Sequence, residues 1–282
     1  MNKRTDGLDI VIWIVMIGSI VVTMYPVLLI VAGSFSGQEA FLRGEVGIIP
    51  VDFTLNNYKK VFAMGEIWSS YWNSIKYTVL STVVSLICTC GMAYALSKRH
   101  LVGRKFFTYM LMFTMMFSGG MIPTFLIISK LGMVNTIWAI VLPGAVSAWY
   151  VILARTFFEG IPDSLEESAK IDGANDVIVF AKIYLPLSMP IVATLALYFA
   201  VGQWNNFMGP LIYMNETKDY PLALLLRQWL VSDIGNQSDP SALSNTVRNY
   251  TAIVVSTLPI LCVYPFVQRY FTQGMMVGAI KG

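Results

Sequence analysis

Long apolar runs separated by polar segments dominate the pattern of this sequence. Six windows contain no Asp, Glu, Lys, Arg or His, and each is long enough to cross a bilayer as a helix. They are 10–35, 77–97, 106–129, 131–154, 183–215 and 249–268. Because backbone groups in lipid must be satisfied within the segment itself, each window is predicted to be a helix. The pattern predicts an all-α polytopic membrane protein with six transmembrane helices.

Basic residues between the windows predict the orientation. The segment KRHLVGRK at 98–105 carries four Lys and Arg residues and no acid, which is typical of a cytoplasmic loop. The same side receives the basic residues that flank the first and last windows, Lys3, Arg4, Arg269 and Lys281. We therefore expect both termini in the cytoplasm and two long segments, 36–76 and 216–248, outside.

Composition agrees with a multi-pass protein of the cytoplasmic membrane. Hydrophobic residues make up 56% of the 282 residues and charged residues only 12%, whereas a soluble domain carries about 25% charged residues. A net charge of +3 without a basic stripe argues against nucleic acid as a partner. Cys88, Cys90 and Cys262 lie in apolar runs and are predicted to be free thiols. The first window is longer than the apolar region of a cleavable signal peptide, so we expect it to be retained.

The windows also lack the groups that would drive transport from within the membrane. Ion-coupled transporters place carboxylates or histidines inside the bilayer, and the one histidine here, His100, lies in the 98–105 loop. No GxxxxGK[ST] string is present to bind ATP. We expect the energy to enter through a separate subunit; a secondary sugar carrier or facilitator is the alternative. An integral-membrane enzyme is disfavoured because the chain has one histidine and no carboxylate cluster outside the segment 155–182.

The segment 155–182, between the fourth and fifth windows, contains helix start signals. Pro162 ends the preceding helix. A capping box is then expected from one of two pairs, Asp163 with Glu166 or Ser164 with Glu167. Acidic residues in the first turn suit the helix dipole. A short helix is therefore predicted over 164–172.

Stop signals follow that short helix. Gly173 stands where a left-handed C-cap favours glycine. Asn175 or Asp176 can cap a second short helix, and Pro186 marks the start of the fifth span. The predicted arrangement is helix, glycine turn and helix at the membrane surface.

The same segment carries a motif with fixed spacing. It reads E-S-A-x3-G-x9-I-x-L-P, and its members are Glu167, Ser168, Ala169, Gly173, Ile183, Leu185 and Pro186. The motif resembles the EAA loop of binding-protein-dependent ABC importer permeases, E-A-A-x3-G-x9-I-x-L-P, and departs from it only at Ser168. Strings at 117–125, 131–147, 201–214 and 265–282 extend the resemblance to the carbohydrate-uptake branch, with its maltose-type and LplC-like permeases.

The resemblance implies the ABC type-1 transmembrane fold, with a cytoplasmic coupling helix between helices 4 and 5. It also implies a permease subunit that is not an enzyme and that translocates a sugar, as an oligosaccharide or polysaccharide fragment. ATP and Mg would be bound by a separate ATPase, and this chain would hold no cofactor and no metal. The implied ATPase-coupling residues are the seven motif residues together with Asp172.

The resemblance further implies a set of partners and a division of the chain. The partners are a second homologous permease, expected as a heterodimer, two ATPase subunits docked at 164–186, an extracellular solute-binding lipoprotein, the sugar and the lipid bilayer. We expect an N-terminal helix with the first extracellular segment in 1–71, the permease domain in 72–270 and a cytoplasmic tail in 271–282.

Two clusters inside the windows are candidates for the substrate path. Gly119 and Gly120 loosen the third window and either line a cavity or permit close helix packing. The fifth window contains aromatic rings that can stack on the C–H faces of a sugar and side-chain amides that can bond its hydroxyl groups. The alternative is that the aromatic residues form a belt at the membrane interface. The candidates in the fifth window are Trp204, Asn205, Asn206 and Tyr213.

Two other features favour structural roles. The methionines of the third window suit flexible packing better than soft-metal binding; they are Met110, Met112, Met115, Met116 and Met121. Arg155, at the inner end of the fourth window, is predicted to extend to lipid headgroups.

Overall fold

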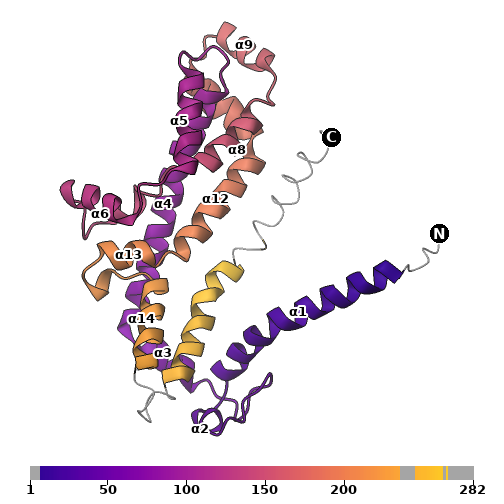
Figure 1. The fold of residues 1–282 in the computed structure, drawn as a ribbon, viewed down its shortest axis with the longest axis vertical. Coiled ribbons are helices and arrows are strands. Elements are labelled where there is room, and N and C mark those ends of the chain that lie inside the picture. Colours follow the sequence, from indigo (N-terminus) through magenta and orange to yellow (C-terminus); the bar gives the residue numbers. More distant parts are fainter. Residues whose placement is uncertain (1–6, 236–244, 263–264, 266–282) are drawn as a thin grey trace. The chain divides into compact units, whose positions relative to one another are not determined.

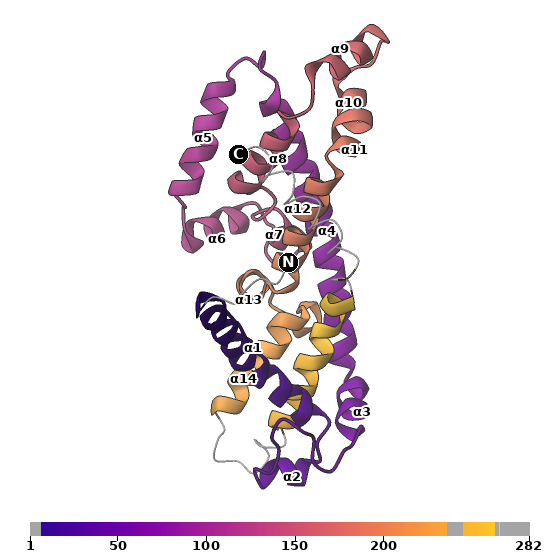
Figure 2. The same cartoon turned by 90° about the vertical axis from the view of Figure 1, so that its right-hand side faces the viewer.

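The computed structural model describes residues 7–235, 245–262 and 265. They form helices and connecting loops, with no strand among them (Figures 1 and 2). This confirms an all-helical fold for the described residues. Two compact units are present: unit 1 combines 1–68 with 225–258, and unit 2 combines 69–224 with 259–282.

Unit 1 contains the first predicted span. Its helices are α1 (Gly7–Ser34), α2 (Gln38–Leu42), α3 (Asn56–Ala63), most of α14 (Leu222–Gly235) and the helix that starts at 245. In α1 the segment Val11–Ser34 is long and apolar enough to cross a membrane, and none of its most apolar window is buried. The side chains of that window are therefore left for lipid or for another subunit.

The last turn of α1 is the part that packs within unit 1. Asn57 in α3 donates hydrogen bonds from Nδ2 to the carbonyls of Ser34 (3.2 Å) and Ser36 (2.9 Å). At Gly33 a Cβ atom would lie 2.5 Å from Cδ2 of Tyr250, so glycine is needed for this close approach. These contacts of α1 with the rest of unit 1 lie at the end of the helix.

Unit 2 carries the remaining helices. Its first helix is α4 (Gly65–Ser97), of which the part from Ser69 onward belongs to this unit. The others are α5 (Arg104–Met116), α6 (Met121–Lys130), α7 (Ile137–Val141), α8 (Ala148–Phe158), α9 (Asp163–Ile171), α10 (Asp176–Val179), a π-helix (Phe180–Tyr184), α11 (Leu185–Leu187), α12 (Met189–Trp204), α13 (Met208–Tyr213) and a 3₁₀ turn (Thr217–Asp219).

Three of the apolar windows are interrupted helices, and here the structure differs from the prediction of one helix per window. The window 106–129 bends by 117° between α5 and α6, where Gly120 has a φ of 79°. The window 131–154 is divided by the non-helical segment 142–147, which contains Pro143 and Gly144. In 183–215 the helix stops at 205–207. Proline, paired glycines and paired asparagines give the backbone alternatives to the helix at these breaks.

By length and composition, the described residues contain two helices able to cross a membrane, α1 and α4. The number rises to four if each bent pair is one span: α5 with α6, and Asp176–Leu187 with α12. The sixth window is only partly described, as the helix 245–262. Six spans, the cytoplasmic position of the termini and the domain boundaries stay predictions; the tail 271–282 lies outside the described residues.

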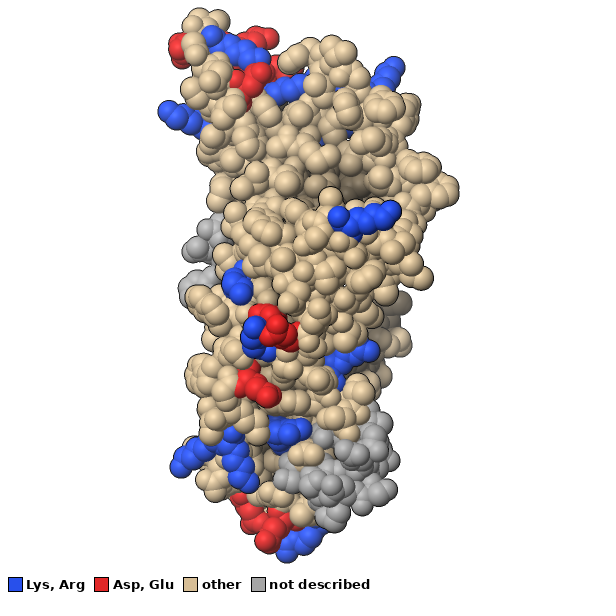
Figure 3. All heavy atoms as spheres, turned by 90° about the vertical axis from the view of Figure 1, so that its left-hand side faces the viewer, with Lys and Arg blue, Asp and Glu red and all other residues tan. Residues whose placement is uncertain are grey.

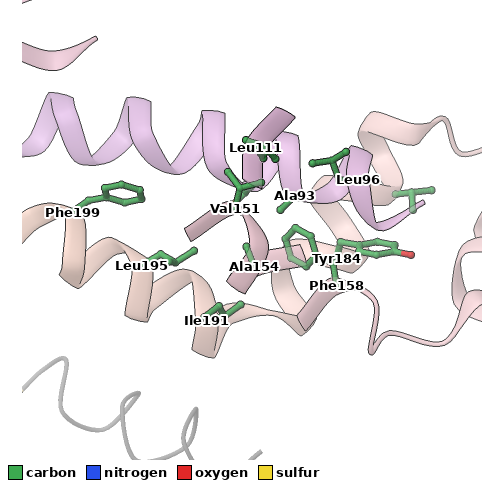
Figure 4. Close-up of a cluster of buried hydrophobic side chains, with 12 residues drawn as sticks. Ala93, Leu96, Leu111, Val151, Ala154, Phe158, Tyr184, Ile191, Leu195 and Phe199 are labelled. Atoms are coloured by element: carbon green, nitrogen blue, oxygen red, sulfur yellow. The ribbon is translucent and has the colours of Figure 1, made fainter. Parts of the chain in front are cut away.

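The core of unit 2 is an apolar cluster between α4, α8 and α12 (Figure 4). Small side chains such as Ala93 and Ala154, both 0% exposed, let these helices approach closely, and Phe158 and Leu195 fill the space between them. Tyr184 extends the cluster to the end of unit 2 where α9 lies. The face in Figure 3 consists mostly of residues other than Lys, Arg, Asp and Glu, as expected for a lipid-embedded chain.

The cysteines are free thiols, as predicted: Cys90 is buried, Cys88 is partly buried and Cys262 is exposed.

Candidate functional site

The predicted surface helix exists as α9, but its N-terminus is built differently from the prediction. Pro162 is the N-cap, in an extended conformation, and no side chain caps the helix. Neither capping box forms. Instead Glu166 is 8% exposed and directs its carboxylate inward. Burial of this acid costs free energy unless it is paired.

The C-terminus of α9 follows the prediction. Gly173 has a φ of 85°, and the amides of Gly173 and Ala174 donate to the carbonyls of Lys170 (3.0 Å) and Ala169 (2.9 Å). This pair of bonds is the Schellman arrangement that satisfies the last carbonyls of a helix. Asn175 then caps α10, since its Oδ1 accepts a 2.9 Å bond from the amide of Ile178. The glycine turn between two short helices is thereby confirmed.

Glu166 is held by groups from three elements. Lys98, directly after α4, forms an ion pair with it, and Lys170 one turn further along α9 forms another at 2.8 Å. The Tyr184 hydroxyl donates a 3.0 Å hydrogen bond to the same carboxylate. The Lys98 ammonium also lies 4.1 Å and 3.9 Å from the ring centroids of Tyr94 and Tyr184. The Glu166 carboxylate thus joins α9 to the end of α4 and to the π-helix. The Lys98 ammonium that pairs with it also makes cation–π contacts with the rings of Tyr94 and Tyr184.

The partners of Glu166 decide its charge state. Burial alone would raise the pKa of Glu166, but the hydrogen bonds from Lys170, Lys98 and Tyr184 outweigh it and lower the pKa to about 2. The bond to Glu166 and a second one to Asp176 raise the pKa of Lys170. Both groups are therefore charged at neutral pH, and the network is a fixed ion cluster at the end of unit 2.

A second ion cluster ties α5 to α8. Arg104 at the start of α5 pairs with Glu159, and Arg155 in α8 pairs with the same carboxylate at 2.9 Å. Arg155 also donates a 3.0 Å bond to Thr108 Oγ1. The expectation that Arg155 extends to lipid headgroups is therefore wrong, because protein partners occupy its guanidinium.

The motif residues divide into exposed and packed groups. Glu167, Ser168, Asp172, Gly173 and Pro186 are exposed, whereas Ala169, Ile183 and Leu185 pack against the core cluster. The packed residues connect the surface helix mechanically to the spans. Their roles in coupling stay predictions.

The outward face of this region is partly apolar. Ile171 is 86% exposed at the end of α9, and Val177 is 73% exposed in α10. In a segment rich in charges, such exposed aliphatic side chains suit a protein partner. A pocket of about 780 Å³ between α9 and the segment that follows α4 is lined by residues of both charge signs, including Arg99, Asp163 and Glu167. Figures 1 and 2 show α9 at the same end of unit 2 as the α4–α5 connection.

The predicted substrate-path residues do not all line the same pocket. A second pocket, of about 410 Å³, includes Asn206 and Tyr213 in its lining but not Trp204 or Asn205. The Trp204 ring packs edge-on against Tyr71, with centroids 6.3 Å apart. Asn205 bonds back to the carbonyl of Val201 at 2.9 Å.

Gly119 and Gly120 form the sharp break between α5 and α6. No atom of the described chain would lie within 4 Å of a Cβ at either position. Close helix packing is therefore not their role within the described residues.

Sequence reasoning does not identify Glu166, Lys98 and Tyr184 as one cluster. The sequence pattern links Lys98 only to topology, and Glu166 only to a capping box. No signal in the sequence singles out Glu166, because Asp163 and Glu167 lie within one turn of it in the same predicted helix.

Comparison with known proteins gives the family. Residues 8–277 match the family described as binding-protein-dependent transport system inner membrane component. The chain belongs to this family. It is related to two permeases of Bacillus subtilis (strain 168). It is 41% identical over 268 residues to the polygalacturonan/rhamnogalacturonan transport system permease protein YtcP, covering 93% of each chain. It is 42% identical over 266 residues to Protein LplC, covering 93% of this chain and 90% of that one.

A solved structure supports the fold of this transport component. It is a bacterial ABC transporter involved in the import of the acidic polysaccharide alginate, with a TM-score of 0.87 and 34% identity. The match covers 96% of this chain and 99% of that chain. The family and this likeness together agree with the type-1 permease fold implied by the EAA-like motif.

Proposed function

We propose that this chain is the membrane-spanning permease subunit of an ATP-driven importer that carries an oligosaccharide into the cell. The observation that carries the proposal is α9, a surface helix with a Schellman turn at Gly173 and an exposed Ile171. A secondary carrier would have no use for such a helix. The names of the relatives, which refer to polygalacturonan, rhamnogalacturonan and alginate, support a carbohydrate substrate.

The mechanism follows from how α9 is attached. A separate ATPase binds the outward face of α9. The Lys98–Glu166 ion pair and the packed Ile183 transmit the movement of α9 to α4 and α12. The spans then alternate between outward-open and inward-open states. A second permease completes the pathway, and a solute-binding protein delivers the sugar from outside. In this scheme the chain itself hydrolyses nothing.

The exposed isoleucines provide a test. Ile171→Glu should abolish copurification of the ATPase subunit with the permease pair. Ile49, which is 76% exposed in the predicted outer segment, gives a matched control. Ile49→Glu should retain the ATPase subunit and its stimulation by the sugar-loaded binding protein. If Ile171→Glu keeps both, α9 is not the docking element; if the wild-type permease purifies with no ATPase, a secondary carrier is the better description.

A further inference from the structure

The pocket of about 410 Å³ lies within unit 2, where two helix interruptions meet. Its lining includes Pro143, Gly144 and Ser147 of the non-helical segment 142–147, between α7 and α8. It also includes Asn206 of the break at 205–207, between α12 and α13. Non-helical backbone inside a membrane is tolerated where it is buried in protein or lines a water-filled cavity. The pocket is therefore a place where a polar solute can meet the chain within the membrane.

An aromatic wall bounds one side of this pocket. The rings of Tyr150 and Tyr198 are stacked, with centroids 5.7 Å apart and planes 15° from parallel. Tyr150 is held in turn by Phe199, whose ring meets it edge-on at 5.0 Å. Tyr198 is 39% exposed. A supported tyrosine pair of this kind offers a flat surface to the C–H face of a sugar ring.

The polar groups of the pocket are amides and hydroxyls. Asn206 accepts a 3.1 Å bond from the amide of Gly209 and donates a 3.4 Å bond to Gln203 Oε1. These bonds orient both amides, and in the described part of the chain the Gln203 Nε2 group donates no hydrogen bond. Ser81 and Ser147 add hydroxyls to the lining. Amides and hydroxyls together can both donate to and accept from sugar hydroxyl groups.

The lining contains no Lys, Arg, His, Asp or Glu. A carboxylate brought into such a site would have no counter-charge, and burial without one is costly. The pocket therefore suits a neutral face of a glycosyl unit, even when other parts of the substrate are acidic.

We propose that this pocket is a subsite for one glycosyl unit of the transported oligosaccharide. The glycosyl unit stacks on Tyr198 and forms hydrogen bonds with Gln203, and the pocket does not distinguish acidic from neutral oligosaccharides. The inference rests on the proposed function and deepens it by placing substrate contact in this chain. The competing occupant is a helix of the second permease, and the experiment distinguishes the two.

The first experiment uses the complete importer in proteoliposomes, with the native cysteines replaced and Ser147→Cys introduced. The rate of modification by a small methanethiosulfonate reagent is measured after trapping with ATP and vanadate. Binding protein loaded with trigalacturonate or arabinotriose should slow the modification by roughly tenfold relative to unloaded binding protein. Ser129→Cys, on the exposed side of α6, is the matched control and should react equally in all conditions. Equal rates for the Ser147→Cys variant with and without sugar, or slow modification in every state because a partner helix covers the position, would overturn the subsite.

The second experiment tests whether the pocket distinguishes an acidic from a neutral oligosaccharide. Gln203→Ala and Tyr198→Ala should raise the concentration of loaded binding protein needed for half-maximal ATPase activity by a similar factor for both oligosaccharides. Tyr198→Phe should retain most of the wild-type response, because the ring face remains. A loss confined to trigalacturonate would contradict the neutral-face assignment. If neither oligosaccharide stimulates the wild-type importer, the proposed function fails as well; stimulation without sugar-dependent protection defeats only the subsite.

Discussion

Lys98 and Glu166 form an ion pair across 68 positions of sequence, and both side chains are nearly buried, at 11% and 10% exposure. Lys98 follows α4, and Glu166 lies in the first turn of α9. The pair therefore joins the long apolar helix α4 to α9, the surface helix that we propose binds the ATPase. A movement of α9 that keeps the pair intact must also move the end of α4.

Removal of the Lys98 charge should weaken this joint. Lys98→Met leaves Glu166 with Lys170 and Tyr184 alone, and we expect a loss of about 2 kcal/mol together with a clear fall in sugar-stimulated ATPase activity. Lys170→Met is the control, because Lys170 is 41% exposed and an exposed pair contributes at most about 1 kcal/mol. Thermal unfolding of the purified importer and ATPase assays measure both effects. Equal effects of the two variants would contradict a special role for Lys98.

The same carboxylate should produce a pH dependence. The pKa of Glu166 falls from an ordinary value of 4.5 to about 2 in the folded protein, so its charged form is favoured by folding. Its contribution, on the order of 3 kcal/mol, is complete above pH 4.5 and is lost as the pH falls from 4.5 towards 2.

Wild type and Glu166→Gln can be compared across that range. Their difference in melting temperature should be constant from neutral pH down to about pH 5 and should then shrink. A difference that already changes between about pH 6 and 8 would place the effect on another group.

Gly173 should be limited by backbone conformation rather than by space. Its φ is 85°, and no described atom would touch an added Cβ. Gly173→Val should therefore cost about 1–2 kcal/mol through strain alone and should uncouple ATP hydrolysis from uptake while the protein remains in the membrane. Gly173→Asn should be tolerated much better, since asparagine adopts left-handed conformations. Unchanged uptake and stimulated ATPase activity in Gly173→Val would show that the turn has no part in coupling.

Two glycines of α1 should respond differently to the same substitution. Gly33→Ala places a methyl group against the Tyr250 ring and should destabilise the protein by about 1–3 kcal/mol. Gly18→Ala meets nothing within 4 Å in the described chain and should be neutral or slightly stabilising. Thermal unfolding of the two variants gives the comparison. Non-additivity in Gly33→Ala combined with Tyr250→Leu would confirm that the ring is the cause.

Local signals in the sequence predict the features of the site that depend on neighbouring residues. Gly173 and Asn175 can be assigned because a C-cap and an N-cap are formed within a few positions. Gly119 and Gly120 likewise indicate a break in the third window. The interruption at 142–147 is not predicted although Pro143 and Gly144 mark it, because proline and glycine are also tolerated inside transmembrane helices.

Glu166 shows the limit of such reasoning. Its position fits a capping box, and only the three-dimensional neighbourhood reveals that Lys98 and Tyr184 compete successfully for the carboxylate. Likewise, Asn206 and Tyr213 can be chosen by chemistry, but their separation from Trp204 and Asn205 depends on how α12 ends. Pairing over long sequence distances is not encoded in spacing.

The bare flank of α1 turns mutagenesis into a probe of its environment. Since the side chains along Val11–Ser34 find few partners in their own chain, a saturation scan of this stretch would report on neighbours rather than on internal packing. Positions that face lipid acyl chains should accept any apolar residue, whereas positions that pack against a companion subunit should accept only a few side chains. The stripe of intolerant positions would then outline the footprint of that companion.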